Sequence, residues 1–441
     1  MRIPTATGAA ALTATLALLA SSSTAFADWS APQRLLASGE PVSAVAVDAH
    51  GDAAVAWATR FNTDFGPEYR TSIHVTVRTA TGRLITRTLW STRHDRPDSI
   101  AVVLGAGSVT VAWDSLNRAD VGTVRAAYGP LIGRWRPTRT IGRMFVPGFY
   151  PPTRWVPHMA IAPNGAVLLA WPHWNGSYGH EQELDGDAVA WRSPGRPFGA
   201  PQMLPRAPGG AIPQFDARAS AYLYGYCGST VLIAPAHTHR FMRASSLPSA
   251  HVLGFSLSLA GAGQGLASWI AGECSFDAAA GNTSGPVYAS VLSAGTFGKP
   301  LELTPARSDF YYTNVVAVAG GGTVSWSLQS GPPGPVTLSV RIGPAGLPGA
   351  TEQIAGEAIP VNADGGGDEV IAWPAGWPVY LPHLPHTGAI VRPAGGGADQ
   401  PAPGYEGEVA VAAPVGRAVA SLWNTSPTGF GGTLALSVWR P

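Results

Sequence analysis

A short motif that ends in Ala-Trp, or in a close variant, recurs along the chain and constrains its fold more than any other feature. In the first copy an alternating apolar stretch, 45–49, meets a turn at His50-Gly51, and a second stretch ends at Trp57. Further copies end at Trp113, Trp171, Trp269, Trp326, Trp373 and Trp423. Short apolar segments of period two joined by glycine turns predict β-hairpins throughout.

One copy is degenerate. The gap between Trp171 and Trp269 is about twice the usual one, and aligning residues 213–216 with 157–160 brings Tyr226 near the tryptophan position. The chain then holds eight units of about 50 residues, a period typical of β-propeller blades. Two more strands follow in each unit, as at 73–78 and 84–89. A fourth strand that begins near a proline, as at Pro137, suits the outer edge of a blade.

The two ends of the repeat region complement each other. Residues 29–36 resemble a fourth strand with no first three strands before it, and 434–439 resemble a third strand with no fourth after it. Pairing them would close a ring and hide two sheet edges. We therefore expect an all-β fold, a single propeller over residues 28–441, with eight four-stranded blades. Seven blades remain an alternative if the copy near Tyr226 is an insertion, and a two-sheet sandwich is the other alternative.

The first 27 residues have the pattern of a secretory signal peptide. Arg2 provides a cationic start, residues 9–20 are apolar apart from Thr13 and Thr15, and Ala25-Phe26-Ala27 is a small-residue cleavage site. The apolar run is too short for a membrane anchor, which needs about 20 residues. We expect a bacterial protein that is secreted, either extracellular or associated with the cell surface, with no transmembrane segment.

The charge composition argues against a nucleic-acid binder. The chain has 28 basic and 27 acidic residues, so its formal net charge is +1, and Lys299 is its single lysine. Only 12% of residues are charged while 45% are hydrophobic, which favours a folded chain over a disordered stalk. We expect a monomer.

The two cysteines, Cys227 and Cys274, fall just past the tryptophan position in neighbouring units. This alignment puts them at the same end of adjacent blades, and an oxidising compartment permits a disulfide between them. No CxxC motif is present.

The loops differ strongly between the two faces that the propeller predicts. The first-to-second and third-to-fourth turns are short and rich in glycine, whereas the second-to-third and blade-to-blade loops are long and aromatic. Long loops on a rigid scaffold commonly carry binding sites. The densest group is Tyr150, Trp155, His158, His173, Trp174, Tyr178 and His180, beside the acidic residues Glu181, Glu183, Asp185 and Asp187. We expect the recurring tryptophans, in contrast, to fill the core.

Aromatic faces beside carboxylates suit sugar rings, and we take Tyr150, Trp155, His173, Trp174, Tyr178, Glu181 and Glu183 as candidate glycan ligands. The alternative is that the aromatics cap the core and the acids form a solvated loop. The acidic run could also bind Ca²⁺, although its spacing is not that of an EF-hand. We assign no cofactor and no metal site. No H-E-x-x-H, G-x-S-x-G or P-loop motif is present, so no catalytic residue is assigned.

The repeat resembles the secreted sialidase-like (BNR, Asp-box) propellers. Asp48, Gly51 and Trp57 approach the Asp-box order Ser-x-Asp-x-Gly-x-x-x-x-Trp with a different spacing. The resemblance implies the fold over nearly all of the chain after residue 27. The arginine triad and the Tyr–Glu pair of sialidases do not map onto this sequence, so no catalytic residue is carried over.

Three functional hypotheses follow. The first is a non-catalytic propeller that binds a glycan or a cell-surface partner through its aromatic loops. The second is a sialidase-like or other extracellular polysaccharide hydrolase or lyase that uses acids among Glu181, Glu183, Asp185 and Asp187. The third is an envelope scaffold.

Overall fold

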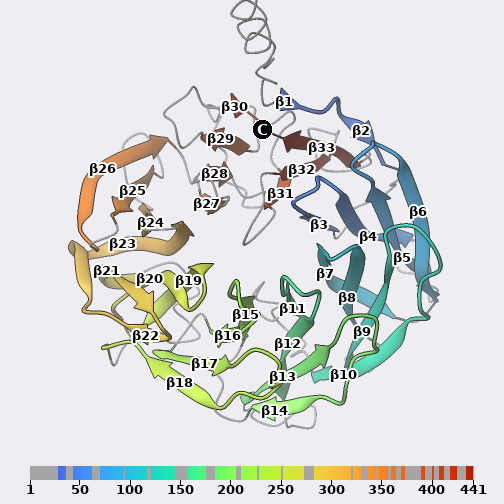
Figure 1. The fold of residues 1–441 in the computed structure, drawn as a ribbon, viewed down its shortest axis with the longest axis horizontal. Coiled ribbons are helices and arrows are strands. Elements are labelled where there is room, and N and C mark those ends of the chain that lie inside the picture. The colour runs from blue at the N-terminus through green and yellow to red at the C-terminus, as the bar shows by residue number, and fades with distance from the viewer. Residues whose placement is uncertain are drawn as a thin grey trace, which may run out of the picture.

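The computed structural model of the chain shows strands arranged around a ring (Figure 1). It describes residues 28–35, 43–61, 70–93, 95–116, 121–145, 157–174, 184–204, 210–225, 228–249, 252–272, 283–318, 321–328, 336–343, 346–355, 359–363, 369–372, 389–392, 400–401, 407–411, 418–424 and 434–440. Within these ranges the chain forms strands and turns, and no helix there could span a bilayer.

The first half of the ring consists of four antiparallel blades. In each one the first strand is innermost and the fourth is outermost (Figure 1). Their strands are β3 (Ser43–Val47), β4 (Ala53–Phe61), β5 (Arg70–Arg78) and β6 (Leu84–Thr92); β7 (Arg96–Gly105), β8 (Ser108–Leu116), β9 (Val121–Pro130) and β10 (Arg139–Phe145); β11 (His158–Ile161), β12 (Val167–Trp174), β13 (Leu184–Arg192) and β14 (Gln202–Leu204); and β15 (Ile212–Phe215), β16 (Ala221–Tyr224), β17 (Thr230–Ala234) and β18 (Arg243–Ser246).

The second half completes eight blades, although the strands group into seven sheets, because blades 5 and 6 share a strand. Blade 5 holds β19 (Leu253–Gly261), β20 (Gln264–Ile270), β21 (Thr283–Ser293) and β22 (Thr296–Phe297); blade 6 holds β24 (Gly321–Leu328), β25 (Val336–Ile342) and β26 (Pro348–Ala355); blade 7 holds β27 (Ile359–Ala363), β28 (Glu369–Ala372), β29 (Ala389–Arg392) and β30 (Gln400–Pro401); and blade 8 holds β31 (Gly407–Val411), β32 (Val419–Asn424) and β33 (Leu434–Arg440). The shared strand, β23 (Leu301–Val318), pairs first with β21 as an outer strand and then with β24 as an inner strand.

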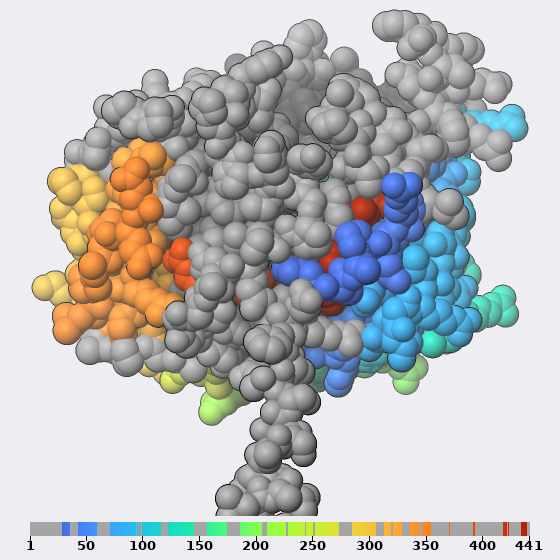
Figure 2. Space-filling model, turned by 90° about the horizontal axis from the view of Figure 1, so that it is seen from above, coloured from blue at the N-terminus to red at the C-terminus, as the bar shows by residue number. Residues whose placement is uncertain are grey.

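The N-terminal strands close the ring, as the sequence predicts. Strands β1 (Asp28–Trp29) and β2 (Gln33–Arg34) pair antiparallel with β33, with Trp29 opposite Trp439 and Gln33 opposite Leu436. The Leu35 amide donates to the Leu434 carbonyl at 2.7 Å, and the Leu35 side chain is buried. In Figure 2 the blue N-terminal residues lie directly against the red C-terminal ones. Blade 8 is therefore built from both ends of the ring.

The five recurring tryptophans whose side chains the structure describes are core residues, as expected. Trp57, Trp113, Trp171, Trp269 and Trp326 are each at most 2% exposed. Each faces the preceding blade: Trp57 packs with blade 8, Trp113 with blade 1 and Trp171 with blade 2. Burying an indole removes about 150–250 Å² from water, worth roughly 4–6 kcal/mol before entropy is counted.

The small residue before each tryptophan has a packing role. Alternation along a strand points Ala112 toward blade 3, where it joins the cluster around Trp171. Gly142 on the outer strand of blade 2 also makes room, because a Cβ there would lie 2.4 Å from Trp171 Cζ2. The Ala-Trp motif thus places a large ring on one face of a blade and a space for the next ring on the other.

The degenerate copy forms a complete blade, β15–β18, so the ring has eight blades. Its first turn repeats that of blade 1: the Asp48 amide donates to the Asp52 carbonyl, and the Asp216 amide donates to the Ser220 carbonyl, both at 3.0 Å. Counting from these turns, the tryptophan position falls on Gly225, one residue before Tyr226, which lies outside the described residues. Tyr222 and Tyr224 are buried in this blade and supply its aromatic packing toward Phe255 of blade 5.

Candidate functional site

The hairpin of β12 and β13 forms the described part of the predicted aromatic site. Its strands extend past the core at Trp171, where His173 pairs with Gly186 and Trp174 with Leu184, across a register shift between His173 and Trp174. The two predicted ligands therefore lie at the long-loop end of blade 3, on the strand directly next to Asp185 and Asp187. This end is the one from which second-to-third loops leave each blade.

Asp187 is fully buried, and its partners show a structural role. Its Oδ1 accepts hydrogen bonds from the amides of Gly210, at 2.9 Å, and Ala211, at 3.2 Å. These amides begin blade 4, so the carboxylate fixes the connection between two blades. Asp114 also has a structural role, within blade 2: its Oδ1 accepts hydrogen bonds from the Ser99 amide and hydroxyl at 2.6 and 2.7 Å. The suggestion that Asp187 serves a calcium ion or catalysis is therefore not supported.

His158, which the sequence grouped with the loops, belongs to the inner strand β11, opposite Ala170. Burial lowers the pKa of its imidazole to about 4, so the ring is neutral at physiological pH. Its partner Ala170 precedes His173 and Trp174 on β12, so His158 lies nearer the middle of the blade than those two residues.

The remaining members of the predicted site lie outside the described residues: Tyr150, Trp155, Tyr178, His180, Glu181 and Glu183. The same holds for Cys227 and Cys274 and for the side chains of Trp174 and Asp185. The Gly228 amide donates to the Val252 carbonyl at 3.2 Å, which brings the chain next to Cys227 to the start of blade 5. The disulfide stays a prediction.

A possible calcium site is likewise a prediction. In the described ranges no three His, Cys, Asp or Glu side chains gather as metal ligands. The acidic residues Glu181 and Glu183 are not among them.

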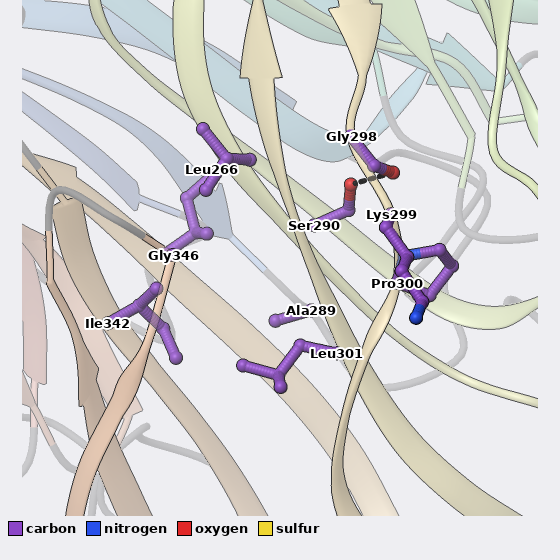
Figure 3. Close-up of a pocket in the computed structure, with 10 residues that line it drawn as sticks. Leu266, Ala289, Ser290, Gly298, Lys299, Pro300, Leu301, Ile342 and Gly346 are labelled. Carbon is purple, nitrogen blue, oxygen red and sulfur yellow. Dashed lines mark hydrogen bonds between the residues drawn. The ribbon is translucent and has the colours of Figure 1, made fainter.

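A cavity of about 470 Å³ lies between blades 5 and 6 (Figure 3). Its walls are mainly apolar, with Leu266 and Ala289 from blade 5, Leu301 from the shared strand and Ile342 from blade 6. Lys299, which is exposed, and Gly298 line its outer side. The Ser290 hydroxyl donates to the Gly298 carbonyl at 2.9 Å and is thereby satisfied within the wall.

Comparing equivalent positions explains why this cavity exists. In blade 8 the outer-strand residue Gln33 accepts from Arg78 of blade 1, Oε1 to Nε, at 2.8 Å. In blade 6 the equivalent Glu352 pairs with Arg392 of blade 7 at 3.3 Å. At the junction of blades 5 and 6 these two positions are held by Leu301, opposite Ala289, and Ile342, opposite Gly322. Two shorter apolar side chains replace a polar bridge and leave the space open.

The cavity can accept an apolar group but offers no catalytic constellation. Among its lining residues, Ser290 carries the one hydroxyl, and neither a histidine nor a carboxylate is present to activate it. Sequence reasoning missed the cavity because Leu301 and Ile342 become equivalent to Glu352 and Arg392 only once the strand registers are known.

No protein-family model matches this chain, and no curated protein matches it. Solved propellers are similar to it at low identity. The Dos1 propeller shares 11% identity with a TM-score of 0.47, over 93% of this chain and 95% of that one. The propeller domain of the Trilobed protease from Pyrococcus furiosus shares 9%, with a TM-score of 0.44, over 78% and 95%. A Hadza microbial sialidase shares 10%, with a TM-score of 0.34, over 84% and 73%. These likenesses concern the fold and not the activity.

Proposed function

We propose that the chain is a non-catalytic, secreted propeller that binds a glycan or a cell-surface partner through its long-loop face. The observation that supports this proposal is the β12–β13 hairpin, which extends past the core at His173 and Trp174, with Asp185 on the neighbouring strand. An aromatic face stacks on the C–H face of a sugar ring, while nearby carboxylates accept from its hydroxyls. The proposal includes Tyr150, Trp155, Tyr178, Glu181 and Glu183 as the remaining ligands.

A glycan array probed with the purified chain starting at Asp28, with and without Ca²⁺, tests this function. We expect selective binding that Trp174→Ala reduces at least about tenfold, since one stacked aromatic contributes on the order of 1 kcal/mol or more. Trp135→Ala is the matched control, because Trp135 lies beside Gly129 near the opposite face of blade 2. Calcium-dependent binding would assign the acidic loop to a metal.

A second assay on the glycans that bind separates binding from hydrolysis. Incubating every bound glycan with the protein and measuring released reducing ends distinguishes a lectin-like protein from a polysaccharide hydrolase or lyase. Release that disappears in Glu181→Gln or Glu183→Gln would replace our proposal with an enzyme. No binding on the array and no release would leave a cell-surface protein partner or the scaffold hypothesis.

A further inference from the structure

The turns opposite the long loops emerge on one face of the ring, which we call the short-turn face, and the structure describes those of blades 1–6. It consists of the first-to-second and third-to-fourth turns: 48–52, 79–83, 105–108, 131–138, 162–166, 193–201, 216–220, 235–242, 261–264, 294–300 and 343–347, of which 344–345 lie outside the described residues. Hydrogen bonds join turns within and between blades: the Leu131 amide donates to the Gly107 carbonyl at 3.3 Å, and the Gly263 amide of blade 5 donates to Asp216 Oδ2 of blade 4 at 2.9 Å.

Exposed apolar side chains concentrate on this face. Five large hydrophobic residues in the described ranges are exposed, and four of them lie in third-to-fourth turns or at the first residue after one: Leu84 (37%), Ile132 (58%), Met242 (68%) and Leu347 (69%). They belong to blades 1, 2, 4 and 6, which are spread around the ring (Figure 1). The fifth, Met203 (42%), is on the outer strand β14.

Positive charge concentrates there as well. The described turns of this face carry seven exposed cations, namely Arg83, Arg134, Arg136, Arg196, Arg218, Arg240 and Lys299. The acidic residues in these turns are three aspartates, and backbone amides donate to the carboxylate of each. Asp48 accepts from His50 and Asp52, Asp52 from Ala80, and Asp216 from Arg218 and Ser220. The described turns of blades 1–6 thus carry seven cations against three aspartates, an excess of four positive charges.

We propose that the short-turn face docks on an anionic lipid surface. Apolar side chains spread around one face of a ring can meet a flat partner together, whereas a small partner would reach one or two blades. Cations alone would suit any polyanion, but a polyanionic chain gains nothing from exposed leucine, isoleucine and methionine. A bilayer offers both an apolar layer at shallow depth and negative headgroups. The long-loop face is then directed away from the membrane.

Vesicle sedimentation with the purified chain starting at Asp28 tests the docking surface. The probes are vesicles of phosphatidylcholine and vesicles that also contain phosphatidylglycerol. We expect at least about tenfold stronger partition onto the anionic vesicles, weakened by high salt. The combined variant Ile132→Ser, Met242→Ser, Leu347→Ser should reduce partition at least about tenfold. Met203→Ser, which removes another exposed apolar side chain (42%) from the outer strand β14, should leave it unchanged.

Three outcomes would overturn the proposal: equal partition onto both vesicle types, no binding to either, or full binding by the combined apolar variant. If that variant binds normally while Arg134→Gln, Arg136→Gln, Arg240→Gln abolishes binding and soluble heparin competes, the partner is a polyanion and not a lipid. Trp174→Ala should leave vesicle binding intact, so this result is independent of glycan recognition on the other face.

Discussion

At the scale of single residues, burial decides the chemistry of most polar groups in the ring. Asp187 is a candidate for an acidic site by sequence, yet its carboxylate accepts hydrogen bonds from the backbone amides that begin blade 4, and the carboxylate of Asp114 is likewise bound by Ser99 within β7. A buried carboxylate is stable when such donors surround it. Asp187 therefore drops out of the predicted acidic site, and the glycan proposal relies on Glu181 and Glu183.

His158 predicts a pH dependence of stability. Its pKa is lowered to about 4 by burial, whereas an unfolded histidine titrates near 6.5. Between these pH values the unfolded chain binds a proton that the folded chain does not. The contribution of His158 to the free energy of unfolding is therefore fully present above about pH 6.5 and is lost as the pH drops from about 6.5 to 4. The contribution is at most about 3 kcal/mol.

Urea unfolding of the wild-type chain and of His158→Gln at several pH values measures this contribution. Other carboxylates and histidines affect both proteins alike, so the difference between the two curves isolates His158. We expect the difference to shrink below pH 6. A constant difference from pH 7 to pH 4 would show that the imidazole does not titrate in this window.

At the scale of strands and blades, the sequence predicts the repeat well because packing imposes it. A tryptophan facing the preceding blade and a small residue facing the next one are needed at every junction, so Trp57, Trp113 and Trp171 mark their blades unambiguously. Blade 4 is harder to recognise in the sequence. Gly225 stands at its tryptophan position and carries no ring, and Tyr222 and Tyr224 fill the space instead. The point at which β23 passes from blade 5 to blade 6 cannot be read from the sequence, because one continuous extended segment serves both blades.

Junctions between blades are less predictable, because they depend on pairs from distant segments. The same two positions hold Gln33 and Arg78 at one junction and Leu301 and Ile342 at another. Between blades 2 and 3 they hold Arg139, opposite Ala126, and Arg192, opposite Val167. Arg192 is 1% exposed, and its Cζ lies 4.8 Å from the centroid of the Tyr128 ring. Its Nε and Nη2 find no acceptor in the described part of the chain.

This junction predicts a stabilising substitution. Arg139→Glu would place a carboxylate where Glu352 meets Arg392 in blades 6 and 7, and we expect it to increase the free energy of unfolding by about 1 kcal/mol or more by satisfying Arg192. The control is the same change in an Arg192→Met background, where the gain should vanish. Equal effects in both backgrounds, measured by urea unfolding, would show that the two positions do not interact.

At the scale of the whole molecule, the ring has two unlike faces with the blades as a rigid spacer between them. The long-loop end of blade 3 carries His173 and Trp174, while the described turns of the short-turn face are basic and carry Ile132, Met242 and Leu347. The first property was accessible from sequence because loop length is visible there. The second was not, since the residues are single positions in separate turns that only the ring brings to one face.

Both faces depend on a closed ring, and closure rests on a short segment. Residues 28–35 pair with β33, bury Leu35, and exchange hydrogen bonds through Ser30, whose hydroxyl accepts from the Val438 amide at 3.0 Å. Removing them exposes the edge of β33 and the apolar cluster of blades 8 and 1. We expect a chain starting at residue 36 to melt about 3 °C lower or more than one starting at Asp28, and to self-associate through the open edge.

Calorimetry and light scattering measure the two effects. A synthetic peptide of residues 28–35 should restore both the Tm and the monomer, because a strand can be supplied in trans to an open edge. The same peptide with Leu35→Asp should fail, since it keeps the backbone pairing and removes the buried side chain. If the shortened chain melts with the longer one and stays monomeric, the last blade is stable with three strands and the ring does not rely on its N-terminal strand.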